Sequence, residues 1–149
     1  MKKAIFGMGC FWEPEQKFFK LNGIESTEVG YCGGNTDKTT YKEVCTGNTN
    51  HAEVVKIEFD EKIISYSDLV KIFFQMHDPT TKNRQGPDMG TQYRSEVFFF
   101  DKEQKKIAEN IKSEFNKKYN GKIVTNISEQ KNYCKAEEYH QKYLQKKGL

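Results

Sequence analysis

The pattern of apolar and polar positions predicts a strand and then a helix at the start of the chain. Residues 4–6 form a short apolar run that is typical of a strand. Pro14 suits the first turn of a helix, where its missing N–H is not needed. The apolar stripe of that helix comprises Phe18, Phe19 and Leu21. Asn22 and Gly23 end the helix, and residues 24–31 predict a second strand.

Strict alternation over residues 51–60 predicts a third strand, with an acidic residue on an apolar face. One face of this strand carries His51, Glu53, Val55, Ile57 and Phe59. Glu53 therefore shares its side with three large apolar residues. Because burying an unpaired carboxylate is costly, we expect Glu53 to be paired, protonated or catalytic.

Helical spacing returns later in the chain. We expect Ser67 to cap a helix that residues 77–79 stop, and its apolar stripe belongs to the core: Leu69, Ile72, Phe73 and Met76. Residues 93–100 predict a strand. Asp101 is expected to cap a lysine-rich helix that carries Ile107, Ile111 and Phe115. Residues 122–128 predict a further strand, and residues 136–146 a last helix.

Two long polar segments, residues 33–50 and 80–92, separate these elements. Segments of this length inside a domain commonly carry function. The order of elements predicts an α+β fold, a ferredoxin-like split βαββαβ core with a C-terminal helix-strand-helix extension. No repeat or linker divides the chain, so we expect one domain over residues 1–149.

Composition excludes several classes of partner. Only 36% of the residues are hydrophobic but 13% are aromatic, so Phe and Tyr must supply much of the core. A net charge of +3 is too small to indicate nucleic acid. No apolar stretch approaches the roughly 20 residues that cross a membrane. The apolar run after Met1, Lys2 and Lys3 is too short for a signal peptide, so we expect a cytoplasmic protein without membrane contact.

In the cytoplasm the four cysteines, Cys10, Cys32, Cys45 and Cys134, should be reduced unless they take part in redox chemistry. Zinc sites typically pair cysteines two to four residues apart, and no pair here is that close. We therefore expect no metal, and nothing in the chain suggests an organic cofactor. A nucleophilic cysteine with possible thiol partners fits this spacing better.

Cys10 lies at the predicted strand-to-helix junction and is the first candidate for that nucleophile. Free N–H groups and the helix dipole can stabilise a thiolate there, which brings the pKa of such cysteines to roughly 3.5–7.5. Glu13 acts in the opposite direction, because a nearby negative charge raises a thiol pKa. The plainer interpretation of Cys10 is a small buried residue that only packs.

Several short sequence blocks are spread along nearly the whole chain, and they contain most of the candidate residues. They are Gly-Cys-Phe-Trp (9–12), Gly-Tyr-Cys-Gly-Gly (30–34), Thr-Tyr-Lys-Glu-Val-Cys-Thr-Gly (40–47), His-Ala-Glu (51–53), His-Asp-Pro (77–79), Arg-Gln-Gly (84–86), Asp-Met-Gly-Thr-Gln-Tyr-Arg-Ser (88–95) and Ala-Glu-Glu-Tyr-His-Gln-Lys-Tyr-Leu (136–144). In this order, the blocks resemble the A-type peptide-methionine sulfoxide reductases. One block alone would be a weak signal, but the series makes chance agreement implausible.

The resemblance implies that Cys10 attacks the sulfur of a methionine sulfoxide, free or within a protein. Phe11 and Trp12 would hold the methyl group of the substrate in an apolar recess. Methionine is then released and Cys10 remains as a sulfenic acid. Because A-type and B-type enzymes divide the two sulfoxide epimers, the S epimer is the expected substrate.

The resemblance also implies that Glu53 shares or donates a proton to the sulfoxide oxygen. That oxygen leaves poorly unless protonated, so the reaction needs an acid with a pKa near the working pH. Desolvation on an apolar strand face would raise the pKa of Glu53 in that direction. Tyr41, Tyr93 and Asp88 would complete the polar wall. Taken singly, the tyrosines fit buried aromatics and Asp88 a turn residue.

Turnover is where this chain departs from many relatives, which carry resolving cysteines in a glycine-rich tail. The sulfenic acid must therefore be reduced by another cysteine or by an external thiol: thioredoxin, glutaredoxin or a small thiol. Cys134, in a predicted loop before the last helix, is the first internal candidate. Cys32, in a predicted flexible turn, is the second. Cys45 lies in a block that looks packed and is expected to be structural.

Two other classes are the alternatives. A cysteine hydrolase would use Cys10 with His51, His77 or His140 as base and would need no reductant. His51 and His140 fit hydrogen-bonded structural histidines better. A binding module with an aromatic recess would keep its function after Cys10→Ser, whereas a reductase would lose turnover. The sequence blocks favour the reductase.

Overall fold

A six-stranded sheet in the order β7-β6-β1-β3-β2-β8 forms the centre of the fold in this computed structural model, which describes residues 2–149. Its main strands are β1 (Lys2–Met8), β2 (Ile24–Cys32), β3 (Ala52–Phe59) and β6 (Ser95–Phe99). Antiparallel pairing joins them as β6-β1-β3-β2, which places the first strand between the third and the last. This is the predicted split βαββαβ arrangement.

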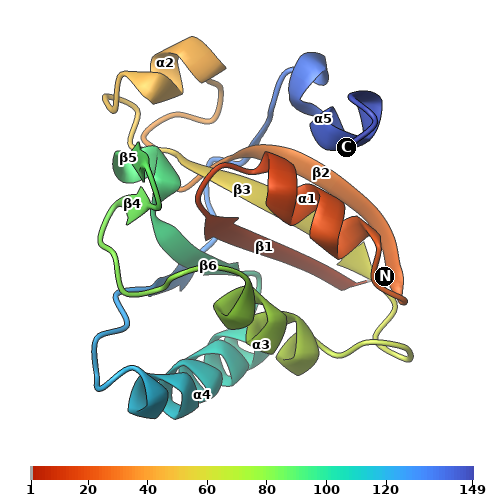
Figure 1. Ribbon diagram of the computed structural model, residues 1–149, viewed down its shortest axis with the longest axis vertical. Coiled ribbons are helices and arrows are strands. Elements are labelled where there is room, and N and C mark those ends of the chain that lie inside the picture. Colours follow the sequence, from red (N-terminus) through yellow and green to blue (C-terminus); the bar gives the residue numbers. More distant parts are fainter. Residues whose placement is uncertain (1) are drawn as a thin grey trace.

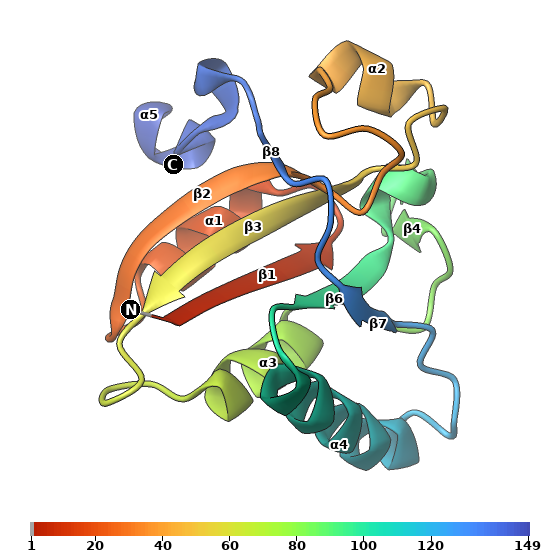
Figure 2. The ribbon, with the colours of Figure 1, turned by 180° about the vertical axis from the view of Figure 1, so that it is seen from behind.

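Three helices cover one face of the sheet: α1 (Trp12–Phe19), α3 (Tyr66–Met76) and α4 (Lys102–Lys118) (Figure 1). Their apolar stripes meet the strands in one core cluster, in which Phe6 of β1 stacks on Phe18 of α1 and Phe73 of α3. Aromatic residues thus supply much of the core, as the composition predicted. Phe19, expected in the same stripe as Phe18, is 46% exposed. The segment between β7 and β8, residues 130–133, crosses the opposite face (Figure 2).

Helix α3 begins two residues earlier in the sequence than a cap at Ser67 would give. Its cap is Ser65, whose Oγ accepts from the backbone N–H of Asp68 at 3.0 Å. The Asp68 carboxylate accepts in return from the Ser65 backbone N–H at 3.2 Å. This reciprocal pair is a capping box, which Ser67 has no partner to form. The predicted cap at Asp101 is confirmed, because its Oδ1 accepts from the Gln104 N–H at 2.9 Å.

The two long polar segments contain short elements that periodicity did not reveal. The first holds α2 (Tyr41–Cys45), which Thr40 caps. The second holds the hairpin strands β4 (Arg84–Gln85) and β5 (Asp88–Met89), followed by the one-turn helix η1 (Thr91–Tyr93). Residues 93–100 were expected to form one strand, but Tyr93 lies in η1 and precedes β6.

The C-terminal part departs most from the prediction. Strand β7 (Asn126–Glu129) runs parallel to β6, and the short β8 (Cys134–Lys135) adds to the edge of β2. In place of one helix over 136–146 there are η2 (Glu138–His140) and α5 (Tyr143–Lys146). The helix breaks because the Gln141 side chain bonds both backbone groups of Val29, and Lys142 takes a left-handed φ of 54°.

Candidate active site

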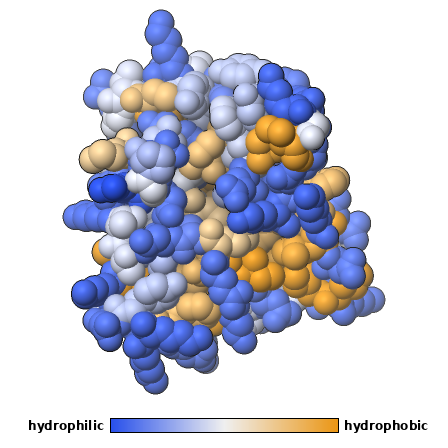
Figure 3. All heavy atoms as spheres, in the orientation of Figure 1, coloured by the Kyte–Doolittle hydropathy of each residue, from blue (hydrophilic) through white to orange (hydrophobic). Residues whose placement is uncertain are grey.

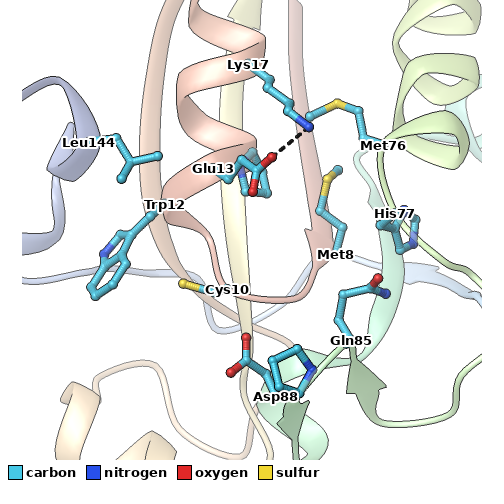
Figure 4. A pocket seen from close by; sticks show the side chains of 13 residues that line it. Met8, Cys10, Trp12, Glu13, Lys17, Met76, His77, Gln85, Asp88 and Leu144 are labelled. Atoms are coloured by element: carbon cyan, nitrogen blue, oxygen red, sulfur yellow. Dashed lines mark ion pairs between the residues drawn. The ribbon is translucent and has the colours of Figure 1, made fainter. Parts of the chain in front are cut away.

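Cys10 lies in the tight connection between β1 and α1, where the sequence placed it. The preceding residue, Gly9, has a φ of 95°, and a Cβ atom there would lie 2.8 Å from the side chain of Gln85. Only glycine fits this turn without strain. Cys10 is half-buried and lines a cleft of about 400 Å³. Its sulfur lies between Trp12 and Asp88 (Figure 4).

The cleft runs from Cys10 along the first turns of α1 toward the end of α3 (Figure 4). Met8 and Met76 line it, so Met76, which packs against the core cluster as expected, also forms part of the cleft wall. Apolar side chains gather between α1 and α3 on this otherwise hydrophilic face (Figure 3). An ion pair of 2.8 Å between Lys17 and Glu13 lies at the rim. The cleft therefore offers apolar surface beside a thiol.

Burial raises the pKa of the Cys10 thiol to about 11, whereas the sequence left open whether the helix terminus or Glu13 would dominate. The backbone N–H of Trp12 bonds the sulfur and lowers the pKa, as a helix N-terminus should, but less than burial raises it. The negative charges of Glu53, Asp88 and Glu13 raise it further, in that order. In the free protein at neutral pH, Cys10 is a thiol.

Glu53 is the buried acid of the site, with 2% of its surface exposed. Its Oε1 accepts from the backbone N–H of Phe11 at 3.4 Å, and its Oε2 accepts from Nε2 of Gln92 at 2.8 Å. These two hydrogen bonds favour the carboxylate, but burial outweighs them and raises the pKa from 4.5 to about 7. The direction that the alternation of β3 predicted is confirmed.

The tyrosines and the aspartate predicted for the polar wall lie around Glu53 and Cys10. Burial, and then the charges of Glu53 and Asp88, raise the pKa of Tyr93 to about 12. Burial and a hydrogen bond with Cys45 raise that of Tyr41 as well. Both hydroxyls therefore stay protonated near neutral pH and can donate. Asp88 lines the cleft with Cys10.

Aromatic rings form the other wall. Phe11 is buried and packs against Tyr31, with ring centroids 5.8 Å apart. Trp12 is half-exposed, lines the cleft and stacks on Tyr143 at 3.8 Å with an interplanar angle of 11°. The indole N–H of Trp12 donates to Nδ1 of His140 at 3.0 Å. Trp12 thus faces the cleft, whereas Phe11 is buried in the cluster against which Trp12 packs and does not line the cleft.

Three further residues hold this site; the sequence suggested no role for Gln92 or Tyr143, and a hydrogen-bonded structural role for His140. Gln92 binds Glu53, and His140 and Tyr143 hold Trp12. All three fall within the sequence blocks, at residues 88–95 and 136–144. The blocks were the available signal, but the residue types alone do not indicate which partner each one meets.

The remaining cysteines differ from their expected settings. Cys32 belongs to β2, not to a flexible turn, and is fully buried with its pKa raised to about 11, chiefly by burial. Cys134 is half-buried in β8, with its Sγ 3.6 Å from the carbonyl oxygen of Thr39. Cys45, expected to be packed, is exposed at the end of α2, 3.5 Å from Nε2 of Gln92. All four thiols are free.

Each of the three histidines has a hydrogen-bond partner other than Cys10. His51 bonds the carbonyl oxygen of Thr36, and His140 accepts from Trp12. His77 bonds the Phe73 carbonyl oxygen and the Ser95 hydroxyl, both at 2.7 Å, and burial lowers its pKa to about 4. The cysteine–histidine pair that a hydrolase requires is therefore not formed in residues 2–149.

The described residues form neither a metal-binding cluster nor a membrane-spanning helix. Within residues 2–149, no three His, Cys, Asp or Glu side chains are grouped so that they could hold a metal ion. None of the helices in that range is both long enough and apolar enough to cross a membrane.

Comparison with known proteins shows the family to which the chain belongs. The family model described as peptide methionine sulfoxide reductase matches residues 2–148. The methionine sulfoxide reductase MsrA of Pelagibacter ubique is 60% identical over 147 residues, which cover 99% of this chain and 100% of that protein. The chain therefore belongs to the peptide methionine sulfoxide reductase family, as an A-type member of this class of oxidoreductases.

Solved structures support the fold. Mxr1 from Saccharomyces cerevisiae in reduced form superposes with a TM-score of 0.92 at 40% identity, covering 99% of this chain and 86% of the yeast chain. Mxr1 in complex with Trx2 has a TM-score of 0.67 at 27% identity and covers 95% of this chain and 84% of the yeast chain.

Proposed function

We propose that the protein reduces methionine-S-sulfoxide, free or within proteins, to methionine, with Cys10 as the nucleophile and Glu53 as the acid. The observation that carries this proposal is the pairing of a protonated thiol with a buried carboxyl whose pKa is about 7, beside the aromatic wall of a cleft. The sulfoxide oxygen is a poor leaving group and must be protonated. An acid whose pKa lies near the working pH is best suited to this, because it is both protonated and able to donate.

In the proposed first step, oxygen moves from the substrate sulfur to the sulfur of Cys10. Glu53 donates its proton to the sulfoxide oxygen, and the resulting carboxylate accepts the proton of the Cys10 thiol. The sulfur–oxygen bond of the substrate breaks and a sulfur–oxygen bond to Cys10 forms. Two electrons pass from the Cys10 sulfur to the substrate sulfur, which leaves methionine and a Cys10 sulfenic acid. Glu53 ends the step protonated.

The remaining site residues fit roles in binding. The hydroxyls of Tyr41 and Tyr93 are neutral donors that can bond the sulfoxide oxygen as charge develops on it. Asp88 lies beside Cys10 on the polar side of the cleft. Trp12 offers an apolar face to the methyl group, and Phe11 supports it from below.

For turnover, we propose Cys134 as the internal resolving residue, ahead of Cys32. In the sheet register Tyr31 lies opposite both Glu53 on β3 and Cys134 on β8. Residues opposite each other point to the same face, so Cys134 lies on the face of Glu53, whereas Cys32 points to the other face. Neighbouring strands are about 4.8 Å apart, so Cys134 lies roughly 10 Å from Glu53, and a disulfide needs movement of the edge strand.

The final electrons come from an external thiol. Thioredoxin is the favoured donor, because the related yeast reductase Mxr1 has been seen in complex with Trx2. Glutaredoxin or a small thiol would perform the same exchange on an accessible disulfide or sulfenic acid. This cycle belongs in a reducing compartment such as the cytoplasm, where four free thiols are maintained.

The experiment that tests the proposed function measures methionine formed from the separate S and R epimers with excess dithiol. We expect rapid release from the S epimer and none above background from the R epimer, and Cys10→Ser should abolish the release. Equal rates on both epimers would overturn the assignment of the epimer. Undiminished release by Cys10→Ser would overturn the role of Cys10.

A further inference from the structure

His140 carries an unusual pair of ring nitrogens. It lies in η2, with 2% of its surface exposed. Its Nδ1 accepts the indole N–H of Trp12 at 3.0 Å, whereas its Nε2 is buried and has no hydrogen-bond partner within the described part of the chain. An indole N–H can only donate, so Nδ1 must be unprotonated. The neutral ring then carries its proton on Nε2.

The surroundings of His140 keep the ring neutral. Burial lowers the pKa of His140 below 6.5, and the nearby Glu137 carboxylate acts in the opposite direction. The other titratable groups against the ring are the phenols of Tyr41 and Tyr139, with centroids 4.7 and 4.2 Å away. Phe11 covers a further side at 5.2 Å. If the His140 ring gained a second proton, Nδ1 would carry an N–H that faces the indole N–H of Trp12 and could no longer accept from it.

The backbone on both sides of His140 is fixed. Glu137 accepts from the Tyr31 hydroxyl and from the Tyr41 backbone N–H, each at 2.8 Å. On the other side, Gln141 bonds the backbone of Val29 at 2.9 and 2.8 Å. His140 is therefore a rigid acceptor rather than a surface side chain that happens to approach Trp12.

We infer that His140 is a positioning residue for the substrate, which holds the indole of Trp12 in the orientation that forms the apolar wall of the cleft. This inference rests on the proposed function, because that wall is where the methyl group of methionine sulfoxide would bind. It assigns to His140 no contact with the reacting atoms. It predicts that loss of the acceptor weakens substrate binding and leaves the chemical step intact.

The first test uses no catalysis. Trp12 is the one tryptophan in the chain, so fluorescence excited selectively at the indole, and not at the eight tyrosines, reports on its environment. In the wild-type protein, we expect an emission change on acidification, with its midpoint below pH 6.5, as His140 gains a proton. His140→Asn should remove this transition, and His51→Asn, at a buried histidine elsewhere, should retain it. A transition that persists unchanged in His140→Asn would overturn the inference.

The second test separates binding from chemistry. The δ oxygen of an asparagine stands close to where Nδ1 of a histidine stands, so His140→Asn keeps an acceptor for Trp12, whereas His140→Phe removes it. We expect His140→Phe to raise KM for methionine-S-sulfoxide about 2- to 10-fold, the effect of one hydrogen bond, with kcat within about 2-fold of wild type. His140→Asn should stay near wild type in both. An equal rise in both variants, or a loss in kcat alone, would overturn the inference.

A double-mutant cycle covers the case in which His140→Phe folds poorly. Trp12→Phe lacks the indole donor, so adding His140→Leu, a second variant without an acceptor, should cause no further change in KM. A further rise would show that His140 acts other than through Trp12. Failure of the proposed function remains distinguishable, because it would abolish methionine release in the wild type and leave the fluorescence transition unaffected.

Discussion

The backbone N–H of Phe11, the residue after Cys10, donates to Oε1 of Glu53 across 3.4 Å. This bond ties the acid on β3 to the turn that carries the nucleophile, although the two residues lie 42 positions apart in the chain. The other carboxylate oxygen of Glu53, Oε2, accepts a hydrogen bond from Nε2 of Gln92 at 2.8 Å. With both oxygens held by donors and the whole group buried, Glu53 has one orientation from which to deliver a proton.

Glu53→Gln keeps the shape of the acid and removes its proton transfer. We expect kcat to fall about 10²- to 10⁴-fold, the usual contribution of a positioned acid. The matched control is Glu58→Gln, on the same strand but on the other face, which should leave kcat unchanged. Comparable losses in both variants would show that the effect is structural.

The rate should also depend on pH through Glu53. Its pKa is raised to about 7, and the protonated form is the active one. Activity at low substrate concentration should therefore be highest below pH 7 and decline as pH rises through that value. A profile that rises over the same range would contradict the role of Glu53 as acid.

Glu53 should cost the protein stability at alkaline pH. Its folded pKa lies above the ordinary value of 4.5, so the folded state holds a proton that the unfolded state has lost. The stability contributed by this proton is fully present below pH 4.5 and is lost as pH rises through about 7. Glu53→Gln should thus raise the free energy of unfolding by about 1–3 kcal/mol at pH 8. Urea unfolding at pH 5 and pH 8 measures this, and an equal effect at both values would contradict it.

Cys10 should react slowly as a free thiol. With its pKa near 11, its alkylation by iodoacetamide should accelerate over the whole range from pH 7 to pH 10. Glu53→Gln should lower this pKa, because it removes the charge that raises it most. A plateau in the alkylation rate below pH 8.5 would show that the helix N-terminus dominates after all.

The C-terminal segment should depend on Glu15. This residue is fully buried in α1, and its carboxylate accepts from the Lys142 backbone N–H at 2.7 Å, from the Lys142 Nζ at 3.1 Å and from the Thr27 hydroxyl at 2.9 Å. Glu15→Ala should lower the free energy of unfolding by roughly 2–4 kcal/mol, because it leaves these donors without an acceptor. Hydrogen exchange should accelerate over residues 141–149. Protection equal to wild type there would contradict this anchoring role.

Local patterns predicted the parts of the site that depend on local structure. The alternation of β3 identified Glu53 and the direction of its pKa, because burial of a strand face is encoded in two-residue periodicity. The position of Cys10 followed from the strand-to-helix junction. Its pKa did not, because the burial that raises it comes from residues distant in the chain.

The predictions that were wrong also concern features that depend on contacts between residues distant in the chain. The break after His140 is caused by contacts of Gln141 and Lys142 with β2 and α1, which no periodicity within residues 136–146 reveals. The exposure of Cys45 likewise depends on how α2 stands away from the sheet (Figure 1). Strand order was predictable because the connections of a split βαββαβ core allow few arrangements.

The central claim is that Cys10 receives the oxygen of the substrate. We would treat the protein with one equivalent of methionine-S-sulfoxide without reductant and map its peptides by mass spectrometry. The account predicts one methionine released per chain and oxidation at Cys10, as a disulfide to Cys134 in the wild type and as a trappable sulfenic acid in Cys134→Ser. Methionine released while Cys10 remains an unmodified thiol would contradict it.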